Sequence, residues 1–156
     1  MKIIPLTKGY FALVDDADYE WINSFEWAAD DGYAVREYVD HATGERSTIP
    51  MHRVIMGLEQ GDPRRIDHVD MIRGNNQRYN LRIATHTQNM WNRPAQKNNT
   101  SGYKGVTWHR QALRWQARIR ANKKTISLGL FDTPREAHEA YKTAADKYHG
   151  EFANYG

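Results

Sequence analysis

The stretch from Arg65 to Arg93 constrains the fold more than any other part of the chain. It reads RIDHVDMIRGNNQRYNLRIATHTQNMWNR, so an Asp-His pair precedes an Asn-rich segment, a short apolar run and an amide-rich tail. The run from Leu81 to Ala84 is typical of a short strand. Thr85 with Gln88 forms a capping box, which predicts the start of a helix. The stretch therefore predicts strand, loop, strand and helix, in that order.

Four polar side chains of this stretch are candidates for one catalytic group: Asp67, His68, Asn80 and Asn89. Carboxylate and amide oxygens can hold a hard divalent cation that keeps its waters and takes a phosphate oxygen. A neutral imidazole can accept a proton from water near neutral pH. The pattern indicates hydrolysis of a phosphate ester with Mg²⁺ or Mn²⁺.

These residues, with Asn80 in NLRIAT and Asn89 in THTQN, resemble the HNH endonucleases, which have a ββα-metal core. The resemblance implies that His68 is the general base and that Asp67 and Asn89 are metal ligands. It implies that Asn80 braces the loop and orients His68. The segment Met71 to Gly74 differs from the Gly-Asp-Gly-Leu type of loop usual in these relatives.

Several alternatives stay open around these positions. The residues that could replace Asn89 or Asn80 are His86, Asn92, Asn75 and Asn76. His52, in MHRVIMG, is either a core or capping histidine or a neighbour of the metal or phosphate. Adjacent strand residues point to opposite faces, so Asp67 and His68 can serve one phosphate only where the chain leaves regular strand geometry.

Residues 1–60 have no catalytic pattern and are expected to complete a small core, because a ββα unit of about 30 residues is too small to be stable alone. The expected elements are a hairpin over residues 2–14, a short helix from Asp15 or Asp16 to Phe25, a hairpin of Gly32–Val39 with Arg46–Pro50, and helical turns at Met51–Met56.

Charge is unevenly distributed along the chain. Residues 1–70 have 7 Lys/Arg and 14 Asp/Glu, whereas residues 71–131 have 12 Lys/Arg and no Asp or Glu. A long tract without carboxylates is typical of a surface that binds a polyanion. The chain has no Cys, which excludes disulfides and thiolate zinc sites.

A second unit follows PAQKNNTS, a polar segment expected to be a linker. Three alternating runs predict strands at Lys104–His109, Arg114–Arg120 and Thr125–Leu130. Thr133 to Glu136 forms a capping box with Pro at the first helical position, and Gly150 is the expected stop of that helix. Small apolar residues at helical spacing let the helix lie close against the sheet.

The middle strand separates apolar from basic side chains. Trp115, Ala117 and Ile119 share one face, and the opposite face has Arg114, Gln116, Arg118 and Arg120. A three-stranded sheet can enter the major groove of DNA, where Arg reads guanine edges. The parity of Trp108 and Trp115 favours packing in the core over stacking on bases.

The segments SGYKGV, WQARIR, LGLFDTPREAHEAY and GEFAN resemble the plant ethylene-response-factor (APETALA-type) DNA-binding domain. The resemblance implies DNA contacts at Lys104, Arg114, Arg118 and Arg120, and we add Arg110 in the first turn. The departures are a longer first turn, Arg118 in place of an acidic residue and Ser127 in place of Trp.

Together these features predict an α+β protein with an HNH nuclease domain at 1–93 (ββα-metal core about 65–93, with extra β-hairpins), a linker at 94–101, and an APETALA-type domain at 102–156 in which a three-stranded antiparallel sheet packs on one α-helix. The expected function is metal-dependent DNA cleavage to 5′-phosphate and 3′-hydroxyl ends. The alternatives are a non-catalytic DNA-binding regulator with a vestigial nuclease half, and an RNA substrate. We expect a monomer or weak homodimer on double-stranded DNA, no membrane association, and a phage-encoded protein in the bacterial cytoplasm.

Overall fold

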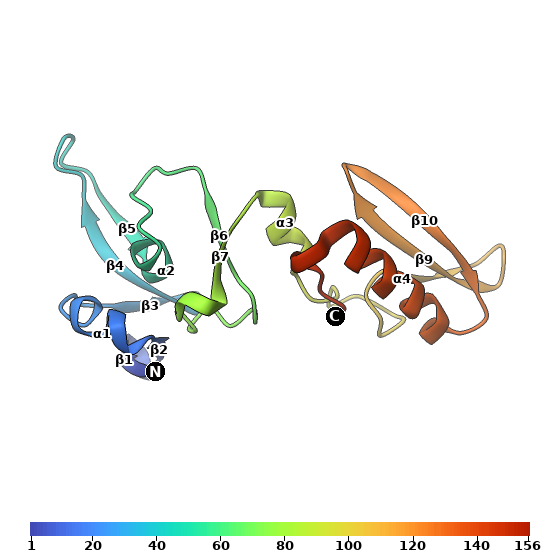
Figure 1. The fold of residues 1–156 in the computed structure, drawn as a ribbon, viewed down its shortest axis with the longest axis horizontal. Helices are drawn as coiled ribbons and strands as arrows, with labels where there is room; N and C mark the ends of the chain where they lie inside the picture. Colours follow the sequence, from blue (N-terminus) through green and yellow to red (C-terminus); the bar gives the residue numbers. More distant parts are fainter. The chain divides into compact units, whose positions relative to one another are not determined.

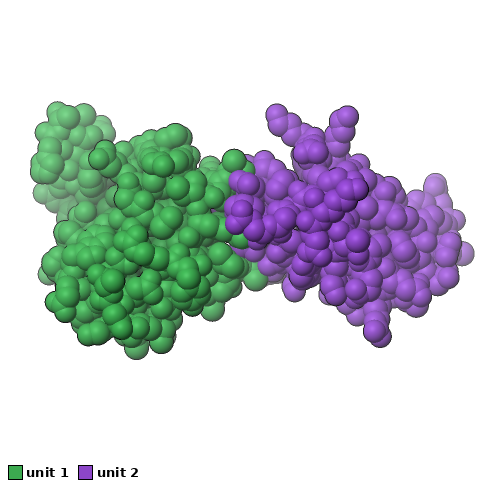
Figure 2. Space-filling model, in the orientation of Figure 1, with its two compact units in different colours: residues 1–85 green, residues 86–156 purple.

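The computed structural model describes residues 1–156, which form two compact units. Unit 1 is Met1–Thr85 and unit 2 is His86–Gly156, coloured green and purple in Figure 2. No helix is long and apolar enough to cross a membrane. The division falls before the helix α3 (His86–Trp91), whereas the predicted nuclease domain ends at residue 93, after that helix. The helix contacts the C-terminal turn of unit 2.

Unit 1 is built from two hairpins and a three-stranded sheet. The hairpins are β1 (Lys2–Pro5) with β2 (Phe11–Val14), and β6 (Arg65–His68) with β7 (Leu81–Ala84). The sheet has the order β3 (Ala28–Asp30), β4 (Tyr33–Val39) and β5 (Arg46–Pro50), all antiparallel. The predicted hairpins are confirmed, and β3 is an addition that is too short to show strand periodicity.

Helices and short turns close the core of unit 1. They are η1 (Thr7–Gly9), α1 (Asp16–Ile22), α2 (Met51–Ile55) and η2 (Arg78–Asn80). The largest fully buried apolar side chains of unit 1 are Ile4, Val14, Ile22 and Met51. Asp15 precedes α1 but does not cap it with its side chain. Its carboxylate instead accepts hydrogen bonds from the Arg78 N–H and the Gln77 amide, and so fixes the turn before β7.

Unit 2 contains α3, a three-stranded antiparallel sheet and one long helix. The sheet consists of β8 (Val106–His109), β9 (Arg114–Ala121) and β10 (Lys124–Phe131), with β9 in the centre. The helix α4 (Pro134–His149) runs along one face of the sheet (Figure 1) and is followed by η3 (Gly150–Phe152). The predicted three-stranded sheet and covering helix are confirmed.

The sequence of α4 explains both its ends and its packed face. Thr133 and Glu136 form the predicted capping box, and Gly150 ends the helix with a positive φ of 55°. The residues that α4 buries are mostly small, and they are Ala137, Tyr141, Ala144, Ala145 and His149. They contact the inward side chains of the sheet, among them Ala117 and Ile119.

Gly105 allows the chain to enter β8 over the ring of Tyr141. Its φ is 76°, and a Cβ at this position would lie 2.1 Å from Tyr141 Cδ2. Tyr141 is almost fully buried, so the ring has no free volume into which it can retreat. Gly102 has nearly the same φ, 75°, but a Cβ there would meet no atom within 4 Å.

We therefore expect Gly105→Ala to destabilise unit 2 strongly and Gly102→Ala to destabilise it weakly. Both variants add backbone strain, but only Gly105→Ala also forces a clash with Tyr141. We expect the free energy of unfolding to fall by about 2–4 kcal/mol in Gly105→Ala and by about 1 kcal/mol in the control, Gly102→Ala. Urea unfolding followed by the fluorescence of the tryptophans measures both. Equal losses in the two variants would contradict this packing.

Candidate functional site

The face of the sheet that α4 leaves uncovered, here called the outer face, is polar and basic. Its polar side chains are Thr107, His109, Arg114, Gln116, Arg118, Arg120, Thr125 and Ser127, all of them exposed or partly exposed, and Leu130 is an apolar residue on the same face. The cross-strand pairs Arg120 with Thr125 and Arg118 with Ser127 put cations beside hydroxyl groups. The predicted separation of an apolar and a basic face is confirmed.

The net charge of the two units differs in sign. Unit 2 has 12 Lys/Arg and 5 Asp/Glu, a net charge of +7, whereas unit 1 has 10 and 14, a net charge of −4. On the outer face, Arg114 is paired with Asp132 at 2.8 Å, and Arg118 and Arg120 are in no ion pair. The outer face therefore has two guanidinium groups without acidic partners, which make its potential more positive.

Two of the five predicted DNA-binding residues lie away from the outer face. Lys104 is half-buried, and its ammonium donates to the carbonyls of Trp91 at 2.7 Å and Arg93 at 2.5 Å. Burial lowers the pKa of Lys104 to about 8. Arg110 is exposed in the turn between β8 and β9. The structure thus gives Lys104 an internal role that the sequence did not reveal.

Trp108 and Trp115 contact each other edge to face, with ring centroids 5.1 Å apart. Trp115 belongs to the apolar cluster under α4, as predicted, whereas Trp108 is 44% exposed. The inward parity of Trp108 is correct, but it lies near the end of the sheet, where α4 covers it incompletely.

His68 ends β6 in a buried aromatic cluster. Its ring centroid lies 5.0 Å from that of His52 and 6.0 Å from that of Tyr33. Burial lowers the pKa of His68, while the Asn76 side chain and the carboxylates of Asp70 and Asp67 act in the opposite direction. A neutral imidazole at neutral pH is the form that a general base requires.

Asp67 is held by a cross-strand arginine. Arg82 Nη2 lies 2.7 Å from Asp67 Oδ2, and Arg82 Nε lies 2.9 Å from the same oxygen. Both side chains are largely buried, at 15% and 5% exposure. Asp67 and His68 pair in regular register with Arg82 and Leu81, so alternation directs the two side chains to opposite faces of β6.

The ion pair with Arg82 is unfavourable for Asp67 as a metal ligand. A Mg²⁺ or Mn²⁺ ion on Asp67 would share its carboxylate with a guanidinium 2.7 Å away, which is electrostatically unfavourable. No group of three or more His, Asp or Glu side chains is arranged to hold a metal ion, whereas the predicted set combines one carboxylate with an amide and stays a prediction. Asn89 lies on α3, in unit 2, and its role as a ligand stays a prediction.

Asn80 closes the loop between β6 and β7. Its Oδ1 accepts from the Asp70 N–H at 2.9 Å, and its Nδ2 donates to Asp70 Oδ1 at 2.9 Å and to the Asn75 carbonyl at 2.8 Å. Asn80 is 1% exposed. This is the loop-bracing geometry that the resemblance implies, and the catalytic role of Asn80 stays a prediction.

Sequence reasoning missed the second half of this loop network. Asp70 also accepts from the Ile72 N–H and the Asn75 amide, both within 2.8 Å. Arg73 donates to the carbonyl and the carboxylate of Asp31, in the turn between β3 and β4. The run of amides after Gly74 was the available signal, because buried amides indicate a loop that is closed by hydrogen bonds.

Comparison with known proteins identifies the class of unit 2. Residues 101–151 match the AP2 domain, so the chain has a C-terminal DNA-binding domain of this class. The AP2-like ethylene-responsive transcription factor AIL5 of Arabidopsis thaliana is 54% identical over 52 residues, 32% of this chain and 9% of that protein. APETALA2-like protein 2 of Oryza sativa subsp. indica is 41% identical over 54 residues, 35% of this chain and 12% of that protein.

A phage protein matches a longer part of the chain. Protein 3.8 of Escherichia phage T7 is 33% identical over 90 residues, which is 58% of this chain and 74% of that protein. The chain therefore belongs to the family of Protein 3.8 of phage T7. No solved structure matches the chain significantly.

His52 supplies a prediction for the stability of unit 1. Burial, and then the charges of His68 and Arg53, lower the pKa of His52 from 6.5 to about 3. Between these two values the unfolded chain binds more protons than the folded one, so the free energy of unfolding falls as the pH falls below about 6.5. The loss reaches up to about 1.4 kcal/mol per pH unit.

Urea unfolding at pH 7 and at pH 5, followed by the indole NMR signal of the buried Trp27, measures this dependence. We expect His52→Gln to be less stable at pH 7 but to have a smaller pH dependence than the wild type. His41→Gln, in the exposed turn after β4, is the control and should keep the wild-type dependence. An unchanged pH dependence in His52→Gln would contradict the assignment.

Proposed function

We propose that the chain is a DNA-binding protein that holds double-stranded DNA on the outer face of the sheet in unit 2. The observation that carries this proposal is that Arg118 and Arg120 are in no ion pair, on an AP2-type sheet whose unit has a net charge of +7. A guanidinium can donate two parallel hydrogen bonds to a guanine edge or to a phosphate. The plant relative AIL5 is named a transcription factor, which is consistent with a regulatory role.

Sequence preference requires more than attraction between charges. The outer face offers hydroxyl and amide groups, at Thr107, Gln116, Thr125 and Ser127, beside its guanidinium groups. Thr107 Oγ1 accepts a 3.3 Å hydrogen bond from Arg118, which restricts the guanidinium to fewer orientations. Oriented donors discriminate between base edges, whereas mobile cations contact phosphates without regard to sequence. We propose sequence-biased binding on this basis.

Replacing Arg118 or Arg120 by Ala should weaken binding to duplex DNA roughly tenfold and lower the salt dependence, because each guanidinium contact releases about one counterion. Arg135→Ala is the matched control, since Arg135 is exposed on α4, the helix covering the opposite face. Fluorescence anisotropy over a salt series, with duplex DNA, single-stranded DNA and RNA, measures affinity and preference. Unchanged binding in both outer-face variants would remove the sheet from the interface.

Hydrolysis of DNA is a second proposed function, and one specific observation favours it. A buried His68 at the end of β6 adjoins a loop that Asn80 closes with three hydrogen bonds, as the resemblance to HNH endonucleases implies. The ion pair of Asp67 with Arg82 argues against it. In this proposal His68 accepts a proton from the attacking water as the water oxygen bonds to phosphorus. The bond from phosphorus to the 3′ oxygen breaks, and that oxygen takes a proton from solvent, so the products carry 5′-phosphate and 3′-hydroxyl ends. A phage-encoded protein acting in a bacterial cell is the setting we propose for either function.

Incubation of supercoiled plasmid with Mg²⁺ or Mn²⁺ separates the two proposals. If His68 is the base, the wild type nicks the plasmid and His68→Ala loses at least about 100-fold in rate while it still binds DNA. His41→Ala, exposed in the turn after β4, should cleave like the wild type. Binding without cleavage in the wild type would leave the non-catalytic function alone.

A further inference from the structure

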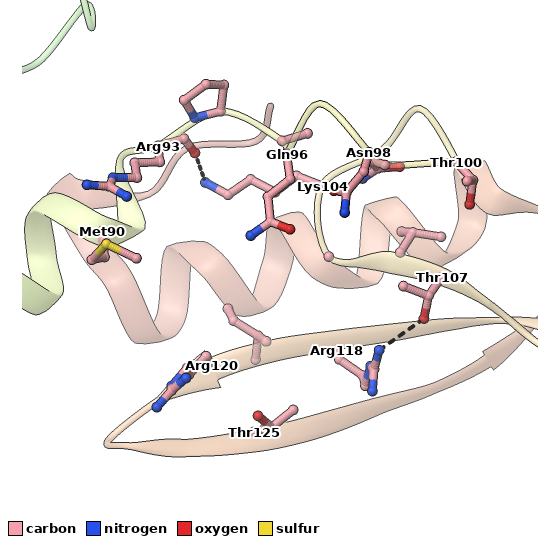
Figure 3. A pocket seen from close by; sticks show the side chains of 16 residues that line it. Met90, Arg93, Gln96, Asn98, Thr100, Lys104, Thr107, Arg118, Arg120 and Thr125 are labelled. Atoms are coloured by element: carbon pink, nitrogen blue, oxygen red, sulfur yellow. Dashed lines mark hydrogen bonds between the residues drawn. The ribbon is translucent and has the colours of Figure 1, made fainter.

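Unit 2 contains a cavity of about 730 Å³ that lies partly outside the AP2 match. One wall is the segment of residues 93–100, here called the wall segment, and the other is the edge of β9 at Arg118–Arg120. We call this cavity the wall groove. Figure 3 shows Arg118, Arg120 and Thr125 on the sheet side, with Arg93, Gln96 and Asn98 above them. The AP2 match begins at residue 101, so nothing known of that domain assigns the wall segment a function.

The wall groove exists because β8 is shorter than β9. The first residue of β8, Val106, pairs with Ala117, and Arg118 donates its N–H to the Gly105 carbonyl. Beyond Arg118, β9 has no strand partner on this side. The positive φ of Gly105, where Tyr141 leaves no room for a Cβ, fixes the point at which the chain turns away from the sheet.

The wall segment is fixed by specific contacts, although its sequence predicts a linker. Lys104 holds the carbonyls of Trp91 and Arg93, as described above. Asn99 donates from Nδ2 to the Tyr103 carbonyl at 2.8 Å and accepts from the Ser101 N–H at 2.9 Å. A wall closed by hydrogen bonds presents its side chains in defined positions, which lowers the entropy cost of binding a ligand.

The groove end of α3 is anchored as well. The ring of Trp91 stacks on that of His149, with centroids 4.2 Å apart and planes at 12°. His149 Nε2 lies 2.9 Å from the Arg120 carbonyl, so the stack is tied directly to the edge of β9. The helix α3, the wall segment and the sheet edge therefore form one surface of unit 2.

The chemistry of the wall groove suits an anion. Its lining contains three arginines, one lysine and several amide and hydroxyl side chains, and it contains no Asp or Glu. Arg93, Arg118 and Arg120 are in no ion pair, so their guanidinium groups are available. The volume is within the range of pockets that hold small ligands, roughly 300–1,000 Å³. Unpaired guanidinium groups together with amide donors are typical of phosphate recognition.

We propose that the wall groove binds a backbone phosphate of the DNA that lies on the outer face, with Arg93 and Gln96 as the residues that the wall segment adds to the interface. This proposal rests on the DNA binding proposed above. Arg118, Arg120 and Thr125 belong to both the outer face and the groove, so a strand leaving the sheet at this edge meets the groove next. A phosphate there is held between two walls instead of on an open surface.

The wall segment has a matched pair of cations for the test. Arg93 lines the groove, whereas Lys97 is exposed on the same segment and does not line it. We expect Arg93→Gln to weaken duplex binding roughly three- to tenfold and to lower the slope of log K against log salt by about one. Lys97→Gln should leave both close to the wild type. Equal effects of the two variants, or none with Arg93→Gln, would overturn the proposal.

Neutral methylphosphonates placed one at a time along the duplex locate the contact. When the methylphosphonate replaces the phosphate bound in the wall groove, the wild type should lose affinity for the duplex. The affinity of Arg93→Gln should not change with the same replacement. A sensitivity profile of Arg93→Gln identical to that of the wild type would refute the groove. Arg114→Ala, on the outer face outside the groove, separates the two proposals. If the wild type does not bind duplex DNA, the proposed function fails. If Arg114→Ala weakens duplex binding and Arg93→Gln does not, the groove alone is refuted.

Discussion

The burial of the Lys104 ammonium against backbone carbonyls organises much of unit 2. Lys104 lies just before β8, and its ammonium donates to the carbonyl of Trp91, the last residue of α3, and to that of Arg93, two residues beyond the helix. A cation at the C-terminus of a helix is also favoured by the helix dipole. One side chain thus joins α3 and the wall segment to the first strand of the AP2 sheet, and its half-buried site lowers its pKa to about 8.

In unit 1, basic side chains form ion pairs with acidic residues that are distant in sequence. Of the basic residues in the acid-free tract of residues 71–131, Arg73, Arg78 and Arg82 pair with Asp31, Asp18 and Asp67, all of which precede that tract. The tract therefore is not one continuous surface for a polyanion, because its first part neutralises acids that are far away in sequence. Removing one partner of a buried pair costs about 3–5 kcal/mol, so Arg82 is needed for the stability of the β6–β7 hairpin whatever Asp67 does.

Local patterns predicted the elements well and the long-range pairings poorly. Alternation gave the three strands of unit 2, and the capping box of Thr133 gave the start of α4, because both signals depend on near neighbours in sequence. The ion pair of Asp67 with Arg82 depends on strand register, which no local pattern states. The wall segment is held in place by hydrogen bonds from Lys104 and Asn99 to backbone carbonyls. Every residue has a backbone carbonyl, so the sequence does not indicate these partners.

In the candidate site of unit 1, one residue of the motif has the contacts that the resemblance implies and another does not. Asn80 closes the loop as the resemblance implies, because its side chain makes three hydrogen bonds to Asp70 and to the Asn75 carbonyl. The carboxylate that would meet a cation is instead neutralised by a guanidinium. A fold retains an amide that holds a loop for the sake of stability, since a buried amide without partners costs about 1–3 kcal/mol. The contacts of Asn80 therefore define the shape of the loop, and the states of Asp67 and His68 bear most directly on catalysis.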